Sequence, residues 1–283
     1  MTRRLFLYAT AGVCVAAAAP QRLPIRKAVE FNMLPTSLSV LDRFRIAREA
    51  GFEEIECPTT PEQAKAEEML AASRQSNLRI HSVMNQEHWR SPLSSADSAV
   101  VDKSMEGMRT SLRNAAFWGA DSVLLVPAVV NPETSYADAW ERSQRHIRTL
   151  IPLAKELKII IGIENVWNKF LLSPLEFARY VDDFQTPSVR AYLDVGNILL
   201  TGYPQDWIRT LGKRIAKVHI KDFSFKKRVA DFTPLFEGEI DWPAVHTAFA
   251  DIGYSGTATV ELSAGDAEYL KEVSRRFDRI LAG

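Results

Sequence analysis

The chain has 283 residues, 46% hydrophobic and 25% charged, enough for one large α/β domain or two smaller domains with a buried core. Its 35 Lys and Arg residues balance 35 Asp and Glu residues, and it has no long basic run, which argues against a nucleic-acid partner or an acidic membrane surface. An internal disulfide is not expected, because Cys14 lies in a segment expected to be removed, which leaves Cys57 as a core residue.

The first twenty residues have the pattern of a targeting segment. Arg3 and Arg4 precede an apolar stretch through Val15, and residues 16–19 are alanines that suit a cleavage site. The stretch is too short to span a membrane, and Arg-Arg-x-Phe-Leu resembles the twin-arginine export signal. We predict that residues 1–20 are an export signal and that residues 21–283 reach the bacterial periplasm without stable membrane association. An uncleaved tail is the alternative, and a lipoprotein is disfavoured by Val13.

From residue 27 onward, apolar runs typical of buried strands alternate with segments that carry a helical apolar stripe. The expected strands are residues 27–31, 53–57, 78–84, 122–126, 159–163, 190–193, 216–220 and 257–260. The expected helices begin near residues 37–39, 61, 98, 136, 173, 204, 241 and 265, several of them at a Ser, Asp or Pro that suits a first helical turn. Two long loops stand out, residues 85–97 with His88 and Trp89, and residues 221–240.

Eight strand-then-helix units in a chain of this length predict a single (β/α)₈ TIM barrel over residues 21–283. No linker or low-complexity segment interrupts the units. An open doubly wound sheet is the alternative, but it gives no reason for polar strand ends to converge. In a barrel, the carboxyl ends of all strands share one mouth.

Four side chains of the metal-binding type occur at the ends of the last four expected strands: Glu164, Asp194, His219 and Glu261. Each one alone has an ordinary structural explanation, such as a turn cap, an ion pair or a core histidine. Their joint placement favours a common site at the mouth. Three carboxylates and one imidazole suit one divalent ion of the Mn²⁺, Mg²⁺ or Co²⁺ kind better than a thiolate-loving metal.

These residues carry a family resemblance. Glu164-Asn165, Asp-Val-Gly-Asn ending at Asn197, Val-His-Ile-Lys-Asp around His219 and Val-Glu-Leu around Glu261 resemble the sugar phosphate isomerase/epimerase family, whose members have a xylose isomerase-like TIM barrel. The resemblance implies that Glu164, Asp194, His219 and Glu261 bind one divalent metal and that the two glutamates flank a ketose. Asn197 departs from the family, since many members have a substrate-contacting histidine there. Glu56 either faces the mouth or lies on the surface.

The implied reaction is proton transfer next to a carbonyl through an enediolate. Negative charge builds on the carbonyl oxygen as the proton leaves, and a metal stabilises it there. One glutamate removes the proton and the other returns one, which inverts the carbon or moves the carbonyl. Glu164 and Glu261 are the predicted pair, without a choice of which is the base.

Several nearby residues are candidates for binding the substrate or the site. The substrate-binding candidates are His81, Trp89, Trp167, Asn197 and Lys221. Lys221 and Asp222 are alternatively expected to orient His219, and the basic run of Lys226, Lys227 and Arg228 either clamps a phosphate or is a solvated face. His146, His246 and Trp118 lie in expected helices and are interpreted as structural or surface residues.

The leading interpretation is a metal-dependent sugar or sugar-phosphate isomerase or epimerase with a small carbohydrate as its partner. Export favours an unphosphorylated keto sugar, and a 3-keto-glycoside lyase using the same residues is the second hypothesis. A non-catalytic sugar-binding barrel is the third. A three-zinc DNA-repair endonuclease is disfavoured, because it needs more than the 5 histidines present and a basic cleft. The sequence leaves open whether the chain forms a homo-oligomer.

Overall fold

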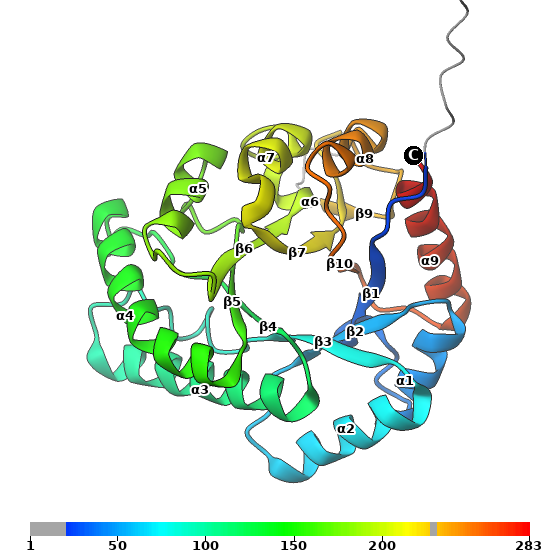
Figure 1. Cartoon of the computed structure of the whole chain (residues 1–283), viewed down its shortest axis with the longest axis horizontal. Coiled ribbons are helices and arrows are strands. Elements are labelled where there is room, and N and C mark those ends of the chain that lie inside the picture. The colour runs from blue at the N-terminus through cyan, green and yellow to red at the C-terminus, as the bar shows by residue number, and fades with distance from the viewer. Residues whose placement is uncertain (1–20, 227–230) are drawn as a thin grey trace, which may run out of the picture.

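The computed structural model describes residues 21–226 and 231–283, so the predicted export signal lies outside the described residues. Eight parallel strands form a closed barrel in the order β1-β10-β7-β6-β5-β4-β3-β2 (Figure 1). Their bounds are β1 (Arg26–Glu30), β2 (Glu54–Pro58), β3 (Arg79–Met84), β4 (Ser122–Leu125), β5 (Ile160–Glu164), β6 (Val189–Asp194), β7 (Ile215–Ile220) and β10 (Thr257–Val260). The predicted TIM barrel is therefore confirmed, and the open sheet is excluded because β1 pairs with β10.

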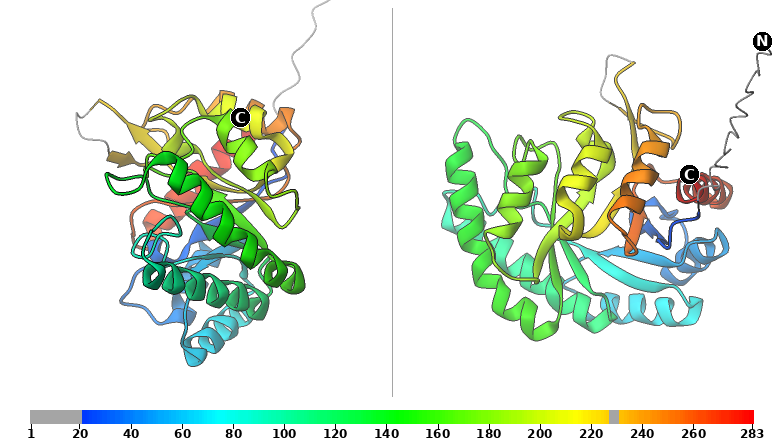
Figure 2. Two further views of the ribbon diagram at one scale, coloured as in Figure 1. Left: turned by 90° about the vertical axis from the view of Figure 1, so that its left-hand side faces the viewer. Right: turned by 45° about the horizontal axis from the view of Figure 1, so that its top comes forward.

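Helices surround the barrel on its outside (Figures 1 and 2). The main ones are α1 (Val40–Glu49), α2 (Gln63–Ser76), α3 (Ser98–Trp118), α4 (Tyr136–Leu157), α5 (Pro174–Asp182), α7 (Pro204–Leu211), α8 (Trp242–Asp251) and α9 (Ala267–Ala282). Serines at positions 39, 135 and 173 cap α1, α4 and α5 by accepting a backbone N–H three residues on. Short 3-10 turns, η1 (Phe31–Met33) and η2 (Gly212–Arg214), complete the set. No helix of the described part is long and apolar enough to cross a membrane.

Two expected loops contain regular structure. The segment around Gly196 forms a short helix, α6 (Val195–Ile198), and the long loop after β7 contains β8 (Asp222–Ser224) and β9 (Asp231–Thr233), an antiparallel ribbon that projects from the barrel (Figure 2). The buried carboxylate of Asp222 accepts hydrogen bonds from Phe236 N, Gly238 N and Trp242 Nε1 at 3.0, 3.2 and 3.1 Å. The expectation that Asp222 orients His219 is wrong, because it fixes the connection to α8.

Candidate metal centre and catalytic pocket

The barrel strands bring the four predicted metal ligands to one point. Glu164 ends β5, Asp194 ends β6, His219 is the fifth residue of β7, and Glu261 follows β10. One ligand atom of each lies within 4.8 Å of the others. From His219 Nδ1 the distances are 2.9 Å to Glu164 Oε1, 3.0 Å to Glu261 Oε2 and 3.9 Å to Asp194 Oδ2. The four residues thus share one mouth, and their binding of a metal stays a prediction.

Glu56 of β2 holds the other ring nitrogen of His219. His219 Nε2 lies 2.8 Å from Glu56 Oε1, and Tyr192 Oη donates a hydrogen bond of 2.6 Å to Glu56 Oε2. All three side chains are fully buried, so the surface alternative for Glu56 is wrong. A carboxylate that fixes one nitrogen of a histidine directs the other nitrogen toward a ligand position. His219 therefore presents Nδ1 to the candidate centre.

Two asparagines of the family motifs fix the backbone around Asp194. Asn165 exchanges two hydrogen bonds of 2.9 Å with the backbone N–H and C=O of Asp194. Asn197 donates its backbone N–H to Asp194 Oδ1 at 2.8 Å and its side-chain amide to Asn165 O at 3.0 Å. Asp194 thus uses Oδ1 to cap α6 and leaves Oδ2 facing His219.

Lys221 contacts the carboxylates, not the histidine. Its Nζ lies 2.8 Å from Asp194 Oδ2 and 2.5 Å from Glu261 Oε2, so the expectation that Lys221 orients His219 is wrong. Burial lowers the pKa of Lys221, but these two carboxylates outweigh it and raise the pKa above its usual value. Burial likewise raises the pKa of Glu261, yet Lys221 and His219 hold that pKa well below its usual range. Burial raises the pKa of Glu164 to about 7, against the hydrogen bond with His219.

The donor atoms fit a divalent cation. Asp194 Oδ2 and Glu261 Oε2 are buried atoms that both lie against the ammonium of Lys221, and Glu261 Oε2 is also 3.0 Å from His219 Nδ1. Three carboxylates gathered around one buried point are costly unless cations balance them. Three carboxylates and one imidazole nitrogen suit Mn²⁺, Mg²⁺ or Co²⁺. Glu164, Asp194, His219 and Glu261 are therefore the residues that would hold the ion.

A cavity of about 260 Å³ lies over this cluster and forms the catalytic pocket. Glu164 and Glu261 line it together with four of the predicted substrate-binding residues: Trp89, Trp167, Asn197 and Lys221. The indole of Trp89 is 53% exposed at the rim. Trp167 donates its Nε1–H to Asn197 O at 3.0 Å, which fixes its ring over the pocket. These aromatic surfaces suit the apolar face of a sugar ring.

Comparison with known proteins agrees with this geometry. Residues 44–279 match the family described as xylose isomerase-like TIM barrels. The chain belongs to this family. Its relatives include L-ribulose-5-phosphate 3-epimerases from Salmonella paratyphi C, 25% identical over 248 residues, and from Shigella boydii, 26% identical over 252 residues. Each match covers 83% of this chain and 86% of the relative. The predicted family resemblance is thereby confirmed, and these relatives are named as isomerases of the predicted epimerase type.

Solved structures share the fold of this xylose isomerase-like barrel. An L-ribulose 3-epimerase superposes with a TM-score of 0.78 at 18% identity, covering 91% of this chain and 94% of that chain. The 3-keto-D-glucoside 4-epimerase from E. coli gives a TM-score of 0.75 at 15% identity, covering 90% of this chain and 99% of that one. At these identities the likeness shows the fold alone.

One predicted substrate contact, His81, is wrong. His81 is the third residue of β3, does not end it, and is fully buried with Nε2 2.9 Å from Thr259 Oγ1. Burial lowers the pKa of His81 well below its usual value, so the ring is neutral in the barrel interior. It does not line the catalytic pocket.

The pocket of this family member also contains residues that the sequence did not single out as substrate contacts. His88 lines it beside Trp89, and its Nδ1 accepts the backbone N–H of Val126 at 3.5 Å. Burial lowers the pKa of His88 to about 4. Phe232 of β9 stacks on Trp167 with ring centroids 5.1 Å apart and 17° between planes. His88 could have been identified from the sequence by its place next to Trp89 in a long loop, whereas no sequence feature pointed to Phe232.

The remaining candidates lie elsewhere. Lys226 is exposed and does not line the pocket, and Lys227 and Arg228 lie outside the described residues. Trp118 and His246 are buried, and His146 is half-buried on α4, all of them apart from the pocket lining, as expected.

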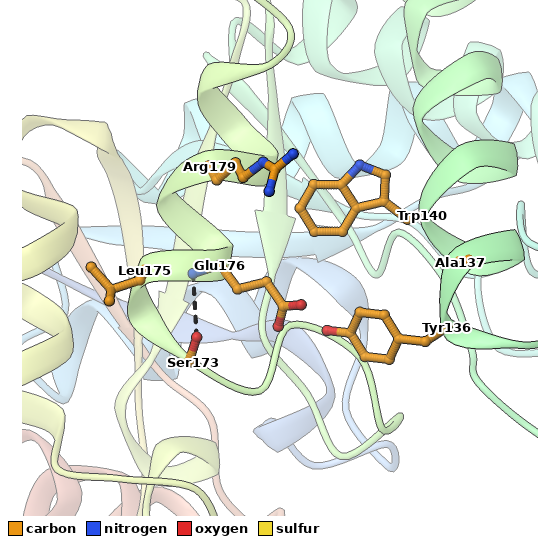
Figure 3. A pocket seen from close by; sticks show the side chains of 7 residues that line it. All are labelled: Tyr136, Ala137, Trp140, Ser173, Leu175, Glu176 and Arg179. Atoms are coloured by element: carbon orange, nitrogen blue, oxygen red, sulfur yellow. Dashed lines mark hydrogen bonds between the residues drawn. The ribbon is translucent and has the colours of Figure 1, made fainter.

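A larger hollow, of about 780 Å³, lies outside the barrel, between α4 and α5 (Figure 3). It is bordered by Tyr136, Trp140, Glu176 and Arg179, and by Leu175, which is 75% exposed. None of the four candidate metal ligands borders it. The hollow is therefore separate from the candidate active site.

Proposed function

We propose that this barrel is a metal-dependent epimerase of an unphosphorylated keto sugar, working by proton transfer at the carbon next to the carbonyl. The observation that supports this most is that Glu164 and Glu261, from β5 and β10, line one pocket over a cluster fit for a divalent ion. When bound, such an ion would stabilise the negative charge that develops on the carbonyl oxygen.

The chain's own residues supply the remaining steps. One of Glu164 and Glu261 takes the proton from the carbon, and the other delivers a proton to it from the other side. Lys221 keeps the carboxylates of Asp194 and Glu261 in place through its short contacts with both. Trp89 and Trp167 cover the sugar ring and exclude water from the pocket.

The pocket supports a neutral substrate. Among the described residues that line it, Lys221 is the one Lys or Arg, and its ammonium is already engaged by two carboxylates. A phosphate group is usually bound by arginine or lysine side chains with free donors. Export through residues 1–20, which we also propose, is consistent with an unphosphorylated sugar, since sugar phosphates belong mostly to the cytoplasm.

The test is deuterium wash-in. The chain from residue 21, loaded with Mn²⁺, is incubated in D₂O with free ketoses, ketose phosphates and 3-keto-glycosides, and the products are followed by NMR. We expect deuterium at the carbon next to the carbonyl together with the epimer, and faster exchange for neutral sugars than for phosphates. No exchange with any substrate would overturn the epimerase. Faster turnover of phosphates would overturn the neutral substrate, and release of the aglycone without epimer would identify the lyase.

A further inference from the structure

A second cavity, of about 220 Å³, adjoins the catalytic pocket; we call it the side cavity. Val166, Trp167 and Asn197 line both cavities, so the two share a wall. Alone, each falls below the roughly 300–1,000 Å³ of typical small-molecule sites, and together they fall within that range. The two cavities are therefore neighbours, and a ligand larger than one sugar ring would reach from one into the other past Trp167 and Asn197.

The lining of the side cavity is mainly apolar and partly open to solvent. Trp207 forms buried surface, while Leu172 and Leu200 are 46% and 50% exposed. Lys169 and Thr201 supply the polar side chains on its outer part. Large apolar side chains that are exposed next to a binding pocket commonly mark a ligand groove.

The loop that forms one side of this cavity is held in a strained conformation. Lys169 and Leu171 have φ values of 61° and 56°, in the left-handed region that residues other than glycine rarely adopt. For a leucine this conformation is unfavourable, because its Cβ approaches the following carbonyl oxygen. Such strain persists where surrounding contacts over-determine it, and it gathers at binding sites.

Those surrounding contacts come from the body of the barrel. Asn168 donates its amide to Ala128 O at 2.7 Å and accepts the backbone N–H of Phe170 at 3.0 Å. Tyr136 Oη accepts the backbone N–H of Leu171 at 2.9 Å. The loop is thus fixed before any ligand binds, so the side cavity is a preformed feature.

We propose that the side cavity binds the apolar aglycone of a keto-glycoside whose keto ring occupies the catalytic pocket. The inference rests on the proposed function and names the substrate class of the same site. An aryl or alkyl group suits Leu172, Leu200 and the indole of Trp207, whereas a second sugar ring would leave most of its hydroxyl groups without partners there. A free monosaccharide would leave the side cavity unused.

The test compares one 3-keto aldose in two forms, free and as its aryl glycoside, by deuterium wash-in with the Mn²⁺-loaded chain, because the carbonyl at carbon 3 is present in both forms. We expect kcat/KM for the aryl glycoside to exceed that for the free sugar about tenfold, the effect of burying one or two methylene equivalents of apolar surface. The variant Leu200→Glu places a charge at the rim of the side cavity. It should reduce this ratio to near one, mainly through KM.

Leu175→Glu is the matched control, because Leu175 is an exposed leucine outside both cavities and should leave the ratio unchanged. Thermal unfolding of each variant verifies that it is folded. Equal kcat/KM values for the two forms in the wild type would contradict aglycone binding in the side cavity but not the epimerase function. An unchanged ratio in Leu200→Glu would have the same meaning. Absence of exchange with either form would instead overturn the proposed function.

Discussion

The two ends of the barrel differ in how their charges are balanced. At the amino-terminal end, Glu54 is 2.7 Å from Arg79 and 3.2 Å from Arg26, and Asp121 is 2.9 Å from Arg79 and 2.7 Å from Lys217. Two carboxylates thus meet three cations of the chain itself. Burial alone would raise the pKa of Asp121, but Lys217 and Arg79 hold it below its usual value. The carboxylates at this end are therefore neutralised by cationic side chains of the chain itself.

The carboxyl-terminal end has the opposite balance. Its carboxylates are the buried Glu30, Glu56, Glu164 and Asp194 and the half-buried Glu261. Against these acids stand His219 and Lys221. Unlike Asp121 of the other end, two of these acids have a pKa that burial raises strongly, Glu30 to about 8 and Glu164 to about 7.

The difference shows what each end does. Charges paired within the chain stabilise the fold and need nothing from outside. An excess of buried carboxylates destabilises the folded chain on its own and becomes favourable only with an added cation. The mouth thus gives up stability for the ability to bind, as functional sites commonly do.

The largest effect expected from this comparison is on turnover. Glu164→Gln and Glu261→Gln should each slow deuterium wash-in about 10²–10⁴-fold, since each removes a proton-transferring group. Glu54→Gln at the opposite end is the control and should retain turnover as long as circular dichroism shows it folded. Full activity in either mouth variant would exclude that glutamate from the proton transfer.

Next in size is the effect of the metal on stability. At an Mn²⁺ concentration of 100 times the Kd, the ion should stabilise the chain by about 2.7 kcal/mol. For a domain of this size, that corresponds to a rise in Tm of roughly 5–10 °C. Thermal unfolding with EDTA and with increasing Mn²⁺ measures it. A Tm that does not change with Mn²⁺ concentration would contradict a metal centre.

Variants of two glutamates on β2 test the difference between the two ends of the barrel directly. Glu56→Gln weakens the support of His219 and should lower Mn²⁺ affinity about 10–100-fold by isothermal titration calorimetry. Glu54→Gln removes a paired charge at the first residue of β2 and should cost about 1–3 kcal/mol in unfolding free energy with the metal affinity unchanged. Equal metal affinities in the two variants would remove the distinction between the ends.

The sequence was enough to predict the barrel and the convergence of Glu164, Asp194, His219 and Glu261, because both depend on order along the chain: an apolar run, then a polar residue at its end. It could not separate Glu54 from Glu56, because two glutamates with one residue between them lie on the same face of a strand. His81 was misassigned, because three more residues of β3 follow it and place it deeper in the barrel. Phe232 reaches the pocket through a ribbon in what the sequence showed as a loop.

The last expected effect is the pH dependence of stability at Glu30, at the end of β1. Burial raises its pKa to about 8, with Glu56 and Glu261 adding to the shift and the backbone N–H of Asn32 opposing it. In the unfolded chain this carboxyl loses its proton near pH 4.5, whereas in the folded chain it does so near pH 8. Between these values the folded state binds more protons than the unfolded state, so the stability that Glu30 contributes is lost as pH rises through 8.

Glu30→Gln should therefore flatten the decline in unfolding free energy of the metal-free chain between pH 5 and about pH 8.5, measured by urea denaturation. The asparagine partner stays available, because an amide oxygen also accepts the N–H of Asn32. Asp266→Asn, which removes a carboxylate from the cap of α9, is the control and should leave the slope as in the wild type. If the slope of the wild type is zero, or is unchanged in Glu30→Gln, the acid excess at the mouth is balanced within the chain after all, and the two ends are not different in kind.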